Sequence, residues 1–308
     1  MSKVLVFGHQ NPDTDAITSA ISFAYLQNQL GVAAEAVALG PVNEETAYAL
    51  NHFETAAPRI VTTAANETQQ VMLVDHNEAQ QSIADIADLE VLAVVDHHRI
   101  ANFETANPLY YRGEPVGCTN TIILKLYKEH GIAIPEKIAG LMLSAIVSDS
   151  LLFKSPTCTP EDVAAAKELA VISKTDLESY GLDMLKAGTN LSTKSEADLL
   201  NMDAKSFPMG DKNVRIGQVN TVDVNEVLAR QAKLEAEMTK QNAKGGFDLF
   251  ILVITDILAS DSAILVIGSD QDKVEKAFET KLTNNQAILP GVVSRKKQVV
   301  PQLTAAFK

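Results

Sequence analysis

The stretch KVLVFGHQNPDTDAIT, residues 3–18, passes from an apolar run through a polar turn into a helical pattern. KVLVF is typical of a buried strand, and the apolar residues after position 16 recur on one stripe of a helix. Three further apolar runs follow along the chain: AEAVAL (34–39), QVMLVD (70–75) and VLAVVD (91–96). Because these strands alternate with helices, the sequence predicts an α/β fold with a doubly wound, mainly parallel sheet and helices on both faces.

Further helical patterns are a segment from about residue 43 and the stretches 119–130, 135–147 and 160–172. The Gly-, Ser- and Thr-containing segment LKAGTNLSTKSE (185–196) is typical of a hinge. Beyond it we expect strands at 214–222, 247–255 and 263–268, with helices from about Asp223 and near 271–282. The sequence therefore predicts a first domain at 1–187, a linker at 188–195, and a smaller α/β domain with a mixed sheet at 196–308.

The totals restrict the class of protein. With 308 residues, of which 46% are hydrophobic and 21% charged, the chain is long enough for two domains and can bury a full core. A net charge of −13 argues against broad binding to nucleic acid or to anionic membranes. Two cysteines, Cys118 and Cys158, are too few for a disulfide framework. No apolar run reaches the length of about 20 residues that spans a bilayer, so we expect a cytoplasmic protein.

Side chains that bind metals collect where the predicted strands end. They are His9, Asp13 and Asp15 after the first strand, Asp75 at the end of 70–75, and Asp96, His97 and His98 after 91–95. The carboxyl ends of parallel strands share one edge of a sheet, so these residues should become neighbours. Asp149 is delivered to the same region by the apolar helical segment LMLSAIVSDS (141–150).

Imidazole and carboxylate without thiolate suit a divalent cation such as Mn²⁺, with Zn²⁺, Co²⁺ or Fe²⁺ as alternatives. Even two of these histidines and four of these aspartates are too many ligands for one ion. They suit two ions about 3.5–4 Å apart that share a carboxylate. Singly, each residue has another interpretation: Asp13 or Asp15 could cap the following helix, and a lone histidine is more often structural. Their convergence at one sheet edge favours the metal site.

His97 and His98 are adjacent, so in an extended segment their side chains should point in opposite directions. One would then bind an ion, and the other would face the substrate as a hydrogen-bond donor or general acid.

The segment VVSRKKQ (292–298) concentrates positive charge in an acidic chain. Arg295, Lys296 and Lys297 could form a solvated patch, or they could hold phosphate groups, for which an Arg fork and a Lys point charge are suited. In the second domain, across a hinge from the metals, they would close over a bound anion. Lys205 in MDAKSF is a weaker candidate for the same role.

Together, GHQNPDTDA, Asp75 in LVDHNEA, the VVDHHR block, Asp149 in VSDS and the late SRKK resemble the manganese-dependent inorganic pyrophosphatases of family II. This family belongs to the DHH phosphoesterase superfamily and carries a C-terminal DHHA2-like domain, and the resemblance covers essentially the whole chain. It implies two Mn²⁺ per subunit, with Co²⁺, Zn²⁺ or Mg²⁺ as substitutes, and a further Mg²⁺ or Mn²⁺ that arrives with the substrate. It also implies a homodimer formed through the N-terminal domain.

The resemblance assigns roles to individual residues. One metal would be bound by His9, Asp13 and Asp75, and the other by Asp15, Asp75, His97 and Asp149. His98 would contact the oxygen between the two phosphoryl groups or help to protonate the leaving phosphate. The phosphates would be held by Lys205, Arg295 and Lys296.

The expected activity is hydrolysis of pyrophosphate to two phosphates, with a hydroxide between the two metals as nucleophile, in a cleft between the domains. One alternative is a DHH-type phosphodiesterase that acts on short oligonucleotides or cyclic dinucleotides. An aromatic content of 5% without Trp disfavours it, because such substrates need stacking surfaces. The other alternative is a phosphate or nucleotide sensor without turnover, which would have no need of a general acid.

Overall fold

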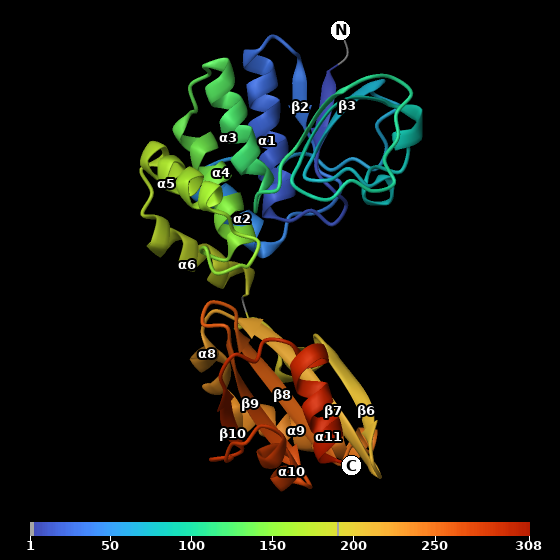
Figure 1. Ribbon diagram of the computed structural model, residues 1–308, viewed down its shortest axis with the longest axis vertical. Helices are drawn as coiled ribbons and strands as arrows, with labels where there is room; N and C mark the ends of the chain where they lie inside the picture. The colour runs from blue at the N-terminus through green and yellow to red at the C-terminus, as the bar shows by residue number, and fades with distance from the viewer. Residues whose placement is uncertain (1–2, 190) are drawn as a thin grey trace. The chain divides into compact units, whose positions relative to one another are not determined.

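The computed structural model describes residues 3–189 and 191–308, which form two compact units, Met1–Gly188 (unit 1) and Thr189–Lys308 (unit 2). Figure 1 shows a sheet with helices in each of them. None of the helices in these described ranges is both long and apolar enough to cross a membrane.

The sheet of unit 1 has five strands, all parallel, in the order β2-β1-β3-β4-β5. They are β1 (Val4–Phe7), β2 (Ala34–Ala36), β3 (Gln70–Val74), β4 (Glu90–Asp96) and β5 (Tyr110–Gly113). The predicted parallel sheet is confirmed, and the strand order reverses between β1 and β3. In open α/β sheets, ligands bind beyond the carboxyl ends of the strands at such a switch point.

The α-helices of unit 1 share one hydrophobic core with the sheet face that carries Val4, Val6 and Val95. They are α1 (Thr14–Gln29), α2 (Glu44–His52), α3 (Thr119–His130), α4 (Glu136–Ser150), α5 (Pro160–Ser173) and α6 (Leu177–Gly188). Figure 1 shows them gathered together, from the blue α1 to the olive α6. Helix α4 is buried almost all round, as its apolar sequence predicts.

The opposite sheet face is covered differently from our expectation. Its core, which includes Leu5, Phe7 and Leu73, is closed by loops and by the 3₁₀ turns Ala79–Gln81 and Ile86–Asp88. Among the described residues no α-helix belongs to this core, so the predicted placement of helices on both faces is wrong. The connection from β3 to β4, residues 75–89, is long enough for a short α-helix but forms the two 3₁₀ turns instead.

Unit 2 is built on a mixed sheet in the order β10-β9-β8-β7-β6, in which only β7 and β8 run parallel. The strands are β6 (Ala204–Met209), β7 (Lys212–Thr221), β8 (Leu249–Asp256), β9 (Asp261–Gly268) and β10 (Gln286–Leu289). One sheet face packs on α7 (Glu196–Asn201), α8 (Val224–Leu228) and α9 (Gln231–Gly245). The other packs on α10 (Gln271–Ala277), a π-helical turn (Arg295–Val299) and α11 (Val300–Ala306).

Two sequence-based boundaries differ in unit 2. The single helix predicted from Asp223 is divided into α8 and α9, and Arg230 lies between them. The Arg230 guanidinium donates to the backbone oxygens of Leu191 and Lys194, which fixes the break against the start of the unit. The predicted helix 271–282 already ends at Ala277. Of the predicted linker 188–195, Gly188 is the last residue of α6, and Asn190 lies outside the described residues.

Candidate metal centre

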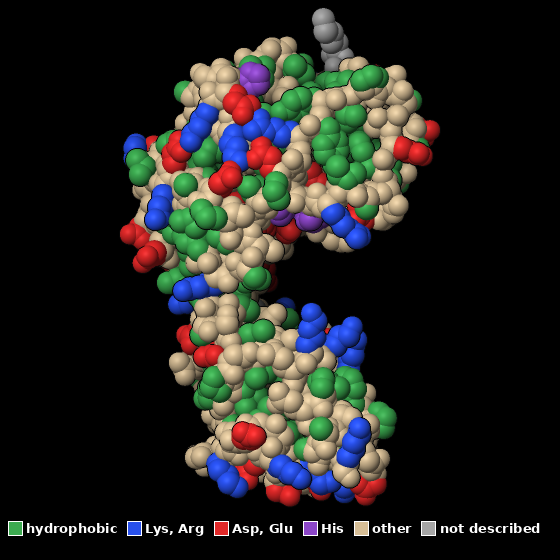
Figure 2. All heavy atoms as spheres, in the orientation of Figure 1, with side chains coloured by type: hydrophobic (Ala, Val, Ile, Leu, Met, Phe, Trp, Pro, Cys, Tyr) green, Lys and Arg blue, Asp and Glu red, His purple; other side chains and the backbone are tan. Residues whose placement is uncertain are grey.

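The residues after β1, β3 and β4 and the end of α4 meet at one edge of unit 1. Donor atoms within 4.8 Å of one another form three groups: His9 with Asp13 and Asp75, Asp15 with His97 and Asp149, and Asp75 with His97 and His98. The structure thus brings together all six metal ligands predicted from the sequence. In the space-filling view, purple histidine side chains lie beside red acidic ones at the surface of unit 1 (Figure 2).

Asp75 lies at the centre of this cluster. Its Oδ2 is 3.4 Å from His9 Nε2, its Oδ1 is 3.3 Å from His97 Nε2, and the side chain is only 2% exposed. The residue follows β3 directly and has a φ of +57°, in the left-handed region that non-glycine residues seldom adopt. The backbone is held there by a hydrogen bond from Asp75 N to Val95 O at 3.0 Å. This strained turn aims the carboxylate along the sheet edge, between two imidazoles.

Two of the histidines have their ring orientation fixed by the backbone. His9 Nδ1 is 2.8 Å from Gln10 O, and His97 Nδ1 is 3.0 Å from Val116 O. A carbonyl can only accept, so in both rings Nδ1 carries the proton and donates. Nε2 is then left without a proton in the neutral ring and is directed at Asp75. This outer hydrogen bond is the usual support of a metal-binding histidine.

The two aspartates near the start of α1 have different environments. Asp13 is the N-cap, since its Oδ1 accepts from Ala16 N at 3.0 Å, while its Oδ2 lies 3.5 Å from His9 Nε2. Asp13 therefore caps the helix and also belongs to the cluster. Asp15 is buried and accepts hydrogen bonds from the backbone N of Thr119 at 2.7 Å and from Asn120 Nδ2 at 2.8 Å.

Asp149 reaches the cluster from the last turn of α4. Its Oδ2 is buried and has no hydrogen-bond partner among the described residues. A carboxylate at a helix C-terminus is also unfavourable with the helix dipole. A buried, unpaired anionic oxygen needs a compensating positive group, and a cation shared with Asp15 and His97 would supply it.

The acidic groups of the cluster resist ionisation together. Burial, followed by repulsion from Asp75, raises the pKa of Asp15 to about 6. Burial and the neighbouring carboxylates Asp15 and Asp75 raise the pKa of Asp149 well above its ordinary value. Burial also opposes ionisation of Asp75, but hydrogen bonds with His9 and His97 outweigh it and lower the pKa of Asp75. The site is therefore short of positive charge.

The histidines show the same imbalance. Burial alone would lower the pKa of His9, but the hydrogen bonds with Asp13 and Asp75 raise it to about 11. Against the same effect of burial, Asp75 and then Asp15 raise the pKa of His97 to about 9. Imidazole nitrogens and carboxylate oxygens around an excess of negative charge fit divalent cations such as Mn²⁺.

His98 is held by the buried residues Asp96 and Asn77; the sequence had pointed to Asp96 but not to Asn77. His98 Nδ1 lies 2.9 Å from Asp96 Oδ1, and Asp96 Oδ2 accepts from Asn77 Nδ2 at 2.6 Å. Asn77 also donates to Arg99 O at 2.9 Å and accepts from Ala101 N at 3.0 Å. Asn77 thus fixes both ends of the turn that carries His98. The signal in the sequence was a polar residue two positions after a ligand, but nothing local indicated its partners.

The expectation that His97 and His98 point in opposite directions is wrong. Their ring centroids are 4.2 Å apart, and both rings approach Asp75 Oδ1, at 3.3 Å from His97 Nε2 and 3.7 Å from His98 Nδ1. The chain bends immediately after β4, so the alternation of side chains in an extended strand does not apply. His98 keeps 52% of its side chain exposed, whereas His97 keeps 16%.

The predicted phosphate-binding residues belong to unit 2. Lys205 is exposed on β6, and Lys296 is exposed in the π-helical turn. Arg295 is 8% exposed, and its NH2 donates to Asp203 Oδ1 at 2.7 Å. Its NH1 also donates to the backbone oxygen of Ile216, the residue that pairs with Lys205 between β6 and β7. Lys205 and Arg295 are therefore tied to the same part of the sheet.

Comparison with known proteins gives the same architecture. Residues 3–146 match the DHH family, N-terminal domain, and residues 182–306 match the DHHA2 domain. The chain is 68% identical to a probable manganese-dependent inorganic pyrophosphatase of Enterococcus faecalis, over 100% of both chains. It is 64% identical to the manganese-dependent inorganic pyrophosphatase of Bacillus subtilis, over 100% of this chain and 99% of that protein. A solved structure from Methanococcus jannaschii, assigned to family II inorganic pyrophosphatases, is 38% identical with a TM-score of 0.62, covering 98% of each chain. The chain therefore belongs to the manganese-dependent inorganic pyrophosphatases of family II.

Proposed function

We propose that the chain hydrolyses inorganic pyrophosphate to two orthophosphates with two divalent ions bound at the cluster of unit 1. The observation that carries this proposal is the sharing of Asp75. It contacts His9 on one side and His97 on the other, and each imidazole belongs to a separate group of donor atoms with its own aspartates. A carboxylate shared by two sites is the arrangement used for in-line displacement at phosphorus.

The proposed ions are Mn²⁺, with Co²⁺, Zn²⁺ or Mg²⁺ as substitutes and a further Mg²⁺ or Mn²⁺ that enters with the substrate. When bound, the pair would lower the pKa of a shared water toward about 7, so that hydroxide is available as the nucleophile, and would neutralise charge on the phosphoryl oxygens. The ligands His9 and His97 are held for this purpose by their Nδ1 hydrogen bonds to backbone carbonyls.

His98 is proposed to act on the leaving phosphate. Its Nδ1 is engaged by Asp96, so Nε2 is the atom that can face a substrate. The hydrogen bond with Asp96 raises the pKa of His98 and so favours the protonated ring. A protonated Nε2 can donate to the oxygen between the two phosphoryl groups as the bond to phosphorus breaks.

Phosphoryl oxygens are proposed to be held by Lys205, Arg295 and Lys296 of unit 2, with the substrate bound between the two units. Arg295 is held in place by hydrogen bonds to Asp203 and Ile216, so a phosphoryl oxygen would be bound by the guanidinium N–H groups that these bonds leave unused. Lys296 lies next to it on an exposed turn and can add a mobile point charge.

The test is phosphate release from pyrophosphate by protein stripped with a chelator, to which Mn²⁺, Mg²⁺ or Zn²⁺ is then restored. A dinucleotide and p-nitrophenyl phosphate are tested in parallel. We expect fast turnover of pyrophosphate with Mn²⁺ and no turnover of the other two compounds. Cleavage of the dinucleotide with pyrophosphate untouched would assign the site to a phosphodiesterase instead. Metal binding without turnover of any of the three compounds would leave a sensor.

We also propose that the protein is a cytoplasmic homodimer that assembles through unit 1. Strand β5 supports the dimer, because among the described residues it pairs only with β4 and so leaves one sheet edge open. Free Cys118 and Cys158 suit a reducing compartment. Light scattering of the Mn²⁺-loaded protein should give twice the mass of one chain, and the mass of a single chain would contradict the dimer.

A further inference from the structure

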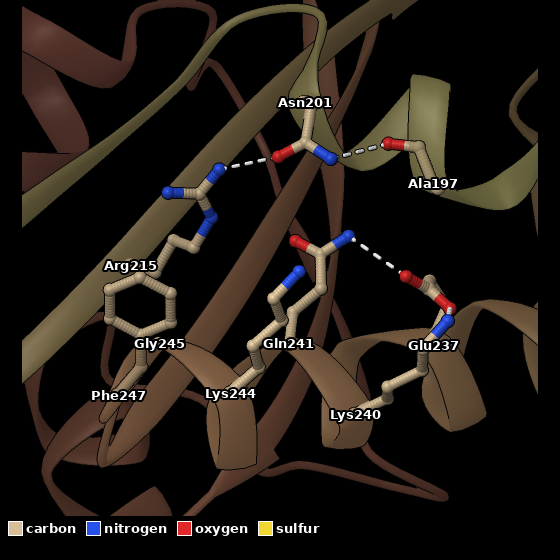
Figure 3. A pocket seen from close by; sticks show the side chains of 9 residues that line it. All are labelled: Ala197, Asn201, Arg215, Glu237, Lys240, Gln241, Lys244, Gly245 and Phe247. Atoms are coloured by element: carbon tan, nitrogen blue, oxygen red, sulfur yellow. Dashed lines mark hydrogen bonds and ion pairs between the residues drawn. The ribbon is translucent and has the colours of Figure 1, made fainter.

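A second group of cationic side chains surrounds a hollow of about 420 Å³ within unit 2 (Figure 3). We call it the Arg215 pocket, and its charged and amide-bearing residues are Asn201, Arg215, Glu237, Lys240, Gln241 and Lys244. They come from α7, β7 and α9, and Figure 3 shows Gln241 and Lys244 extending from α9 toward the Arg215 side chain. None of them belongs to the residues proposed above to bind pyrophosphate.

Arg215 is the fixed charge of this pocket. Its guanidinium carbon lies 5.1 Å from the ring centroid of Phe247 and 5.5 Å from that of Phe250. NH2 donates to Asn201 Oδ1 at 2.5 Å, but NH1 reaches Ser206 Oγ only at 3.5 Å. Nε is buried without a hydrogen-bond partner among the described residues. A guanidinium has five N–H donors, so this one is rigidly placed with much of its hydrogen-bonding capacity unused.

The rest of the lining adds to the positive charge. Lys240 and Gln241 both donate to Glu237, at 3.1 Å and 3.2 Å. Lys244 has no carboxylate partner within the described part of the chain. The pocket therefore holds three cations and one carboxylate, and that carboxylate is already paired. In a chain with a net charge of −13, this local excess favours an anion.

The pocket lies on the opposite side of the sheet from the proposed pyrophosphate-binding residues. Arg215 is paired with Ser206 and Phe250 across the neighbouring strands, on the face that packs on α7 and α9. The next residue, Ile216, is paired with Lys205 and belongs to the other face. Successive residues of a strand point to opposite faces, so the two sets of cations are back to back.

Two short covalent paths nevertheless connect them. Asn201 accepts from Arg215, and two residues later Asp203 accepts from Arg295 at 2.7 Å. Arg215 is also followed directly by Ile216, whose carbonyl accepts from Arg295 NH1 at 3.4 Å. An anion that draws Arg215 away from Asn201 would therefore act on both anchors of Arg295.

We propose that the Arg215 pocket binds a small phosphate-bearing metabolite and that its occupancy changes the affinity of the enzyme for pyrophosphate. The volume is in the range of small-molecule sites and exceeds what inorganic phosphate alone would fill. Arg215 and Lys244 supply the fork and the point charge that suit a phosphate group. The amides of Asn201 and Gln241 can bond hydroxyl groups of the attached organic part. The effect on affinity rests on the proposed role of Arg295, whereas the binding itself does not.

The binding experiment is calorimetric titration of the Mn²⁺-loaded full chain with ribose 5-phosphate, inorganic phosphate and ribose. We expect ribose 5-phosphate to bind more tightly than inorganic phosphate and ribose not to bind. Lys244→Gln should weaken binding of ribose 5-phosphate about tenfold, the loss expected for one charge-assisted contact. Lys276→Gln, an equal change of charge at an exposed position of α10, is the matched control and should leave binding unaltered.

A Lys296→Ala variant tests whether ribose 5-phosphate instead occupies the proposed pyrophosphate site. We expect this variant to bind ribose 5-phosphate as tightly as the wild type does. Equal binding by Lys244→Gln and the wild type, loss of binding in Lys296→Ala, or no binding of either phosphate would overturn the pocket. The change in affinity is read from the KM for pyrophosphate with and without ribose 5-phosphate. A shift in the wild type that is absent in Lys244→Gln is expected, and an unchanged KM despite binding would refute the connection to Arg295.

Discussion

Asp75 is the residue on which the two proposed ion sites depend together. Replacing it by Asn preserves the size of the side chain but removes the negative charge that both sites share. We expect Asp75→Asn to lose bound manganese and to lower pyrophosphate hydrolysis by more than the roughly 10- to 100-fold typical of outer partners of a metal site. Metal content by atomic absorption and phosphate release measured on the same preparation test this.

Asp211→Asn, in the exposed turn between β6 and β7, is the matched control and should retain both metal and activity. Full turnover with both metals retained in Asp75→Asn would remove Asp75 from the site.

Asn77 is proposed to affect the reaction only through Asp96 and His98. If the Asn77 amide is removed, a buried carboxylate oxygen of Asp96 loses its hydrogen-bond donor. The turn that carries His98 also loses two further hydrogen bonds. We expect Asn77→Ala to cost about 1–3 kcal/mol of unfolding free energy and to lower kcat about tenfold while manganese remains bound. Kinetics, metal analysis and thermal unfolding of the variant measure the three quantities.

A double-mutant cycle tests whether Asn77 influences kcat through His98. If Asn77 acts through His98, then adding Asn77→Ala to His98→Ala should lower kcat no further. Additive losses would show that Asn77 supports the site in another way.

At this scale the sequence was enough to predict that the candidate ligands lie together, but not to find the residues that support them. Asp13, Asp75 and His97 were recognisable because each directly follows a strand or opens a helix. Asn77 was not, because its partners Asp96 and Ala101 lie in another loop. The orientation of His97 and His98 was predicted wrongly because the bend after β4 has no clear signature in its residues.

Among the elements, the cationic π-helical turn Arg295–Val299 carries a prediction of its own. Lys296 is exposed there and is proposed to contact substrate but no ion. We expect Lys296→Ala to raise the KM for pyrophosphate about tenfold, because a charge-assisted contact is worth about 1.5–3 kcal/mol, while manganese binding is unchanged. Steady-state kinetics with parallel metal analysis decides this.

The neighbouring Lys297→Ala removes the same charge from the same turn and should change KM little. An equal KM for pyrophosphate in Lys296→Ala and the wild type would show that the turn is a solvated charged patch that does not bind the substrate.

Elements with apolar cores were predictable, and those exposed to solvent were not. Strands β1, β3, β4, β8 and β9 follow long apolar runs, and their predicted positions are confirmed within a few residues. Strands β5, β6 and β10 were missed because all three are sheet edges without a long apolar run, with the sequences YYRG, AKSFPM and QAIL. Their pairing depends on a neighbouring strand, which no local pattern reveals.

For the whole molecule, the ions should stabilise one unit and leave the other unaffected. All six proposed ligands belong to unit 1. An ion at about 100 times its Kd contributes about 2.7 kcal/mol, which for a unit of this size corresponds to roughly 5–10 °C. Chelation should lower the unfolding temperature of unit 1 accordingly, and restored Mn²⁺ should reverse the loss.

Hydrogen exchange localises the effect. Faster exchange after chelation is expected at the start of α1, the start of α3 and the end of α4, with no change in β8 and β9 of unit 2. Equal destabilisation of both units would contradict the confinement of the ions to unit 1.

At the largest scale, the alternation of strands and helices predicted the fold class of both units. The covering of the second face of the unit 1 sheet was predicted wrongly, because the rule of helices on both faces describes the usual arrangement and does not require a helix in every connection. In residues 75–89, two 3₁₀ turns take the place of a helix.

The order of the ligands along the chain has a consequence for biosynthesis. His9, Asp13 and Asp75 have all been translated before β4 exists, whereas Asp149 and the Thr119 backbone N–H that holds Asp15 come much later. A nascent polypeptide that ends before α4 contains all of the first proposed ligand triad and only part of the second. With the proposed ligand sets, the second ion would bind only after α3 and α4 have been synthesised and have packed on the sheet.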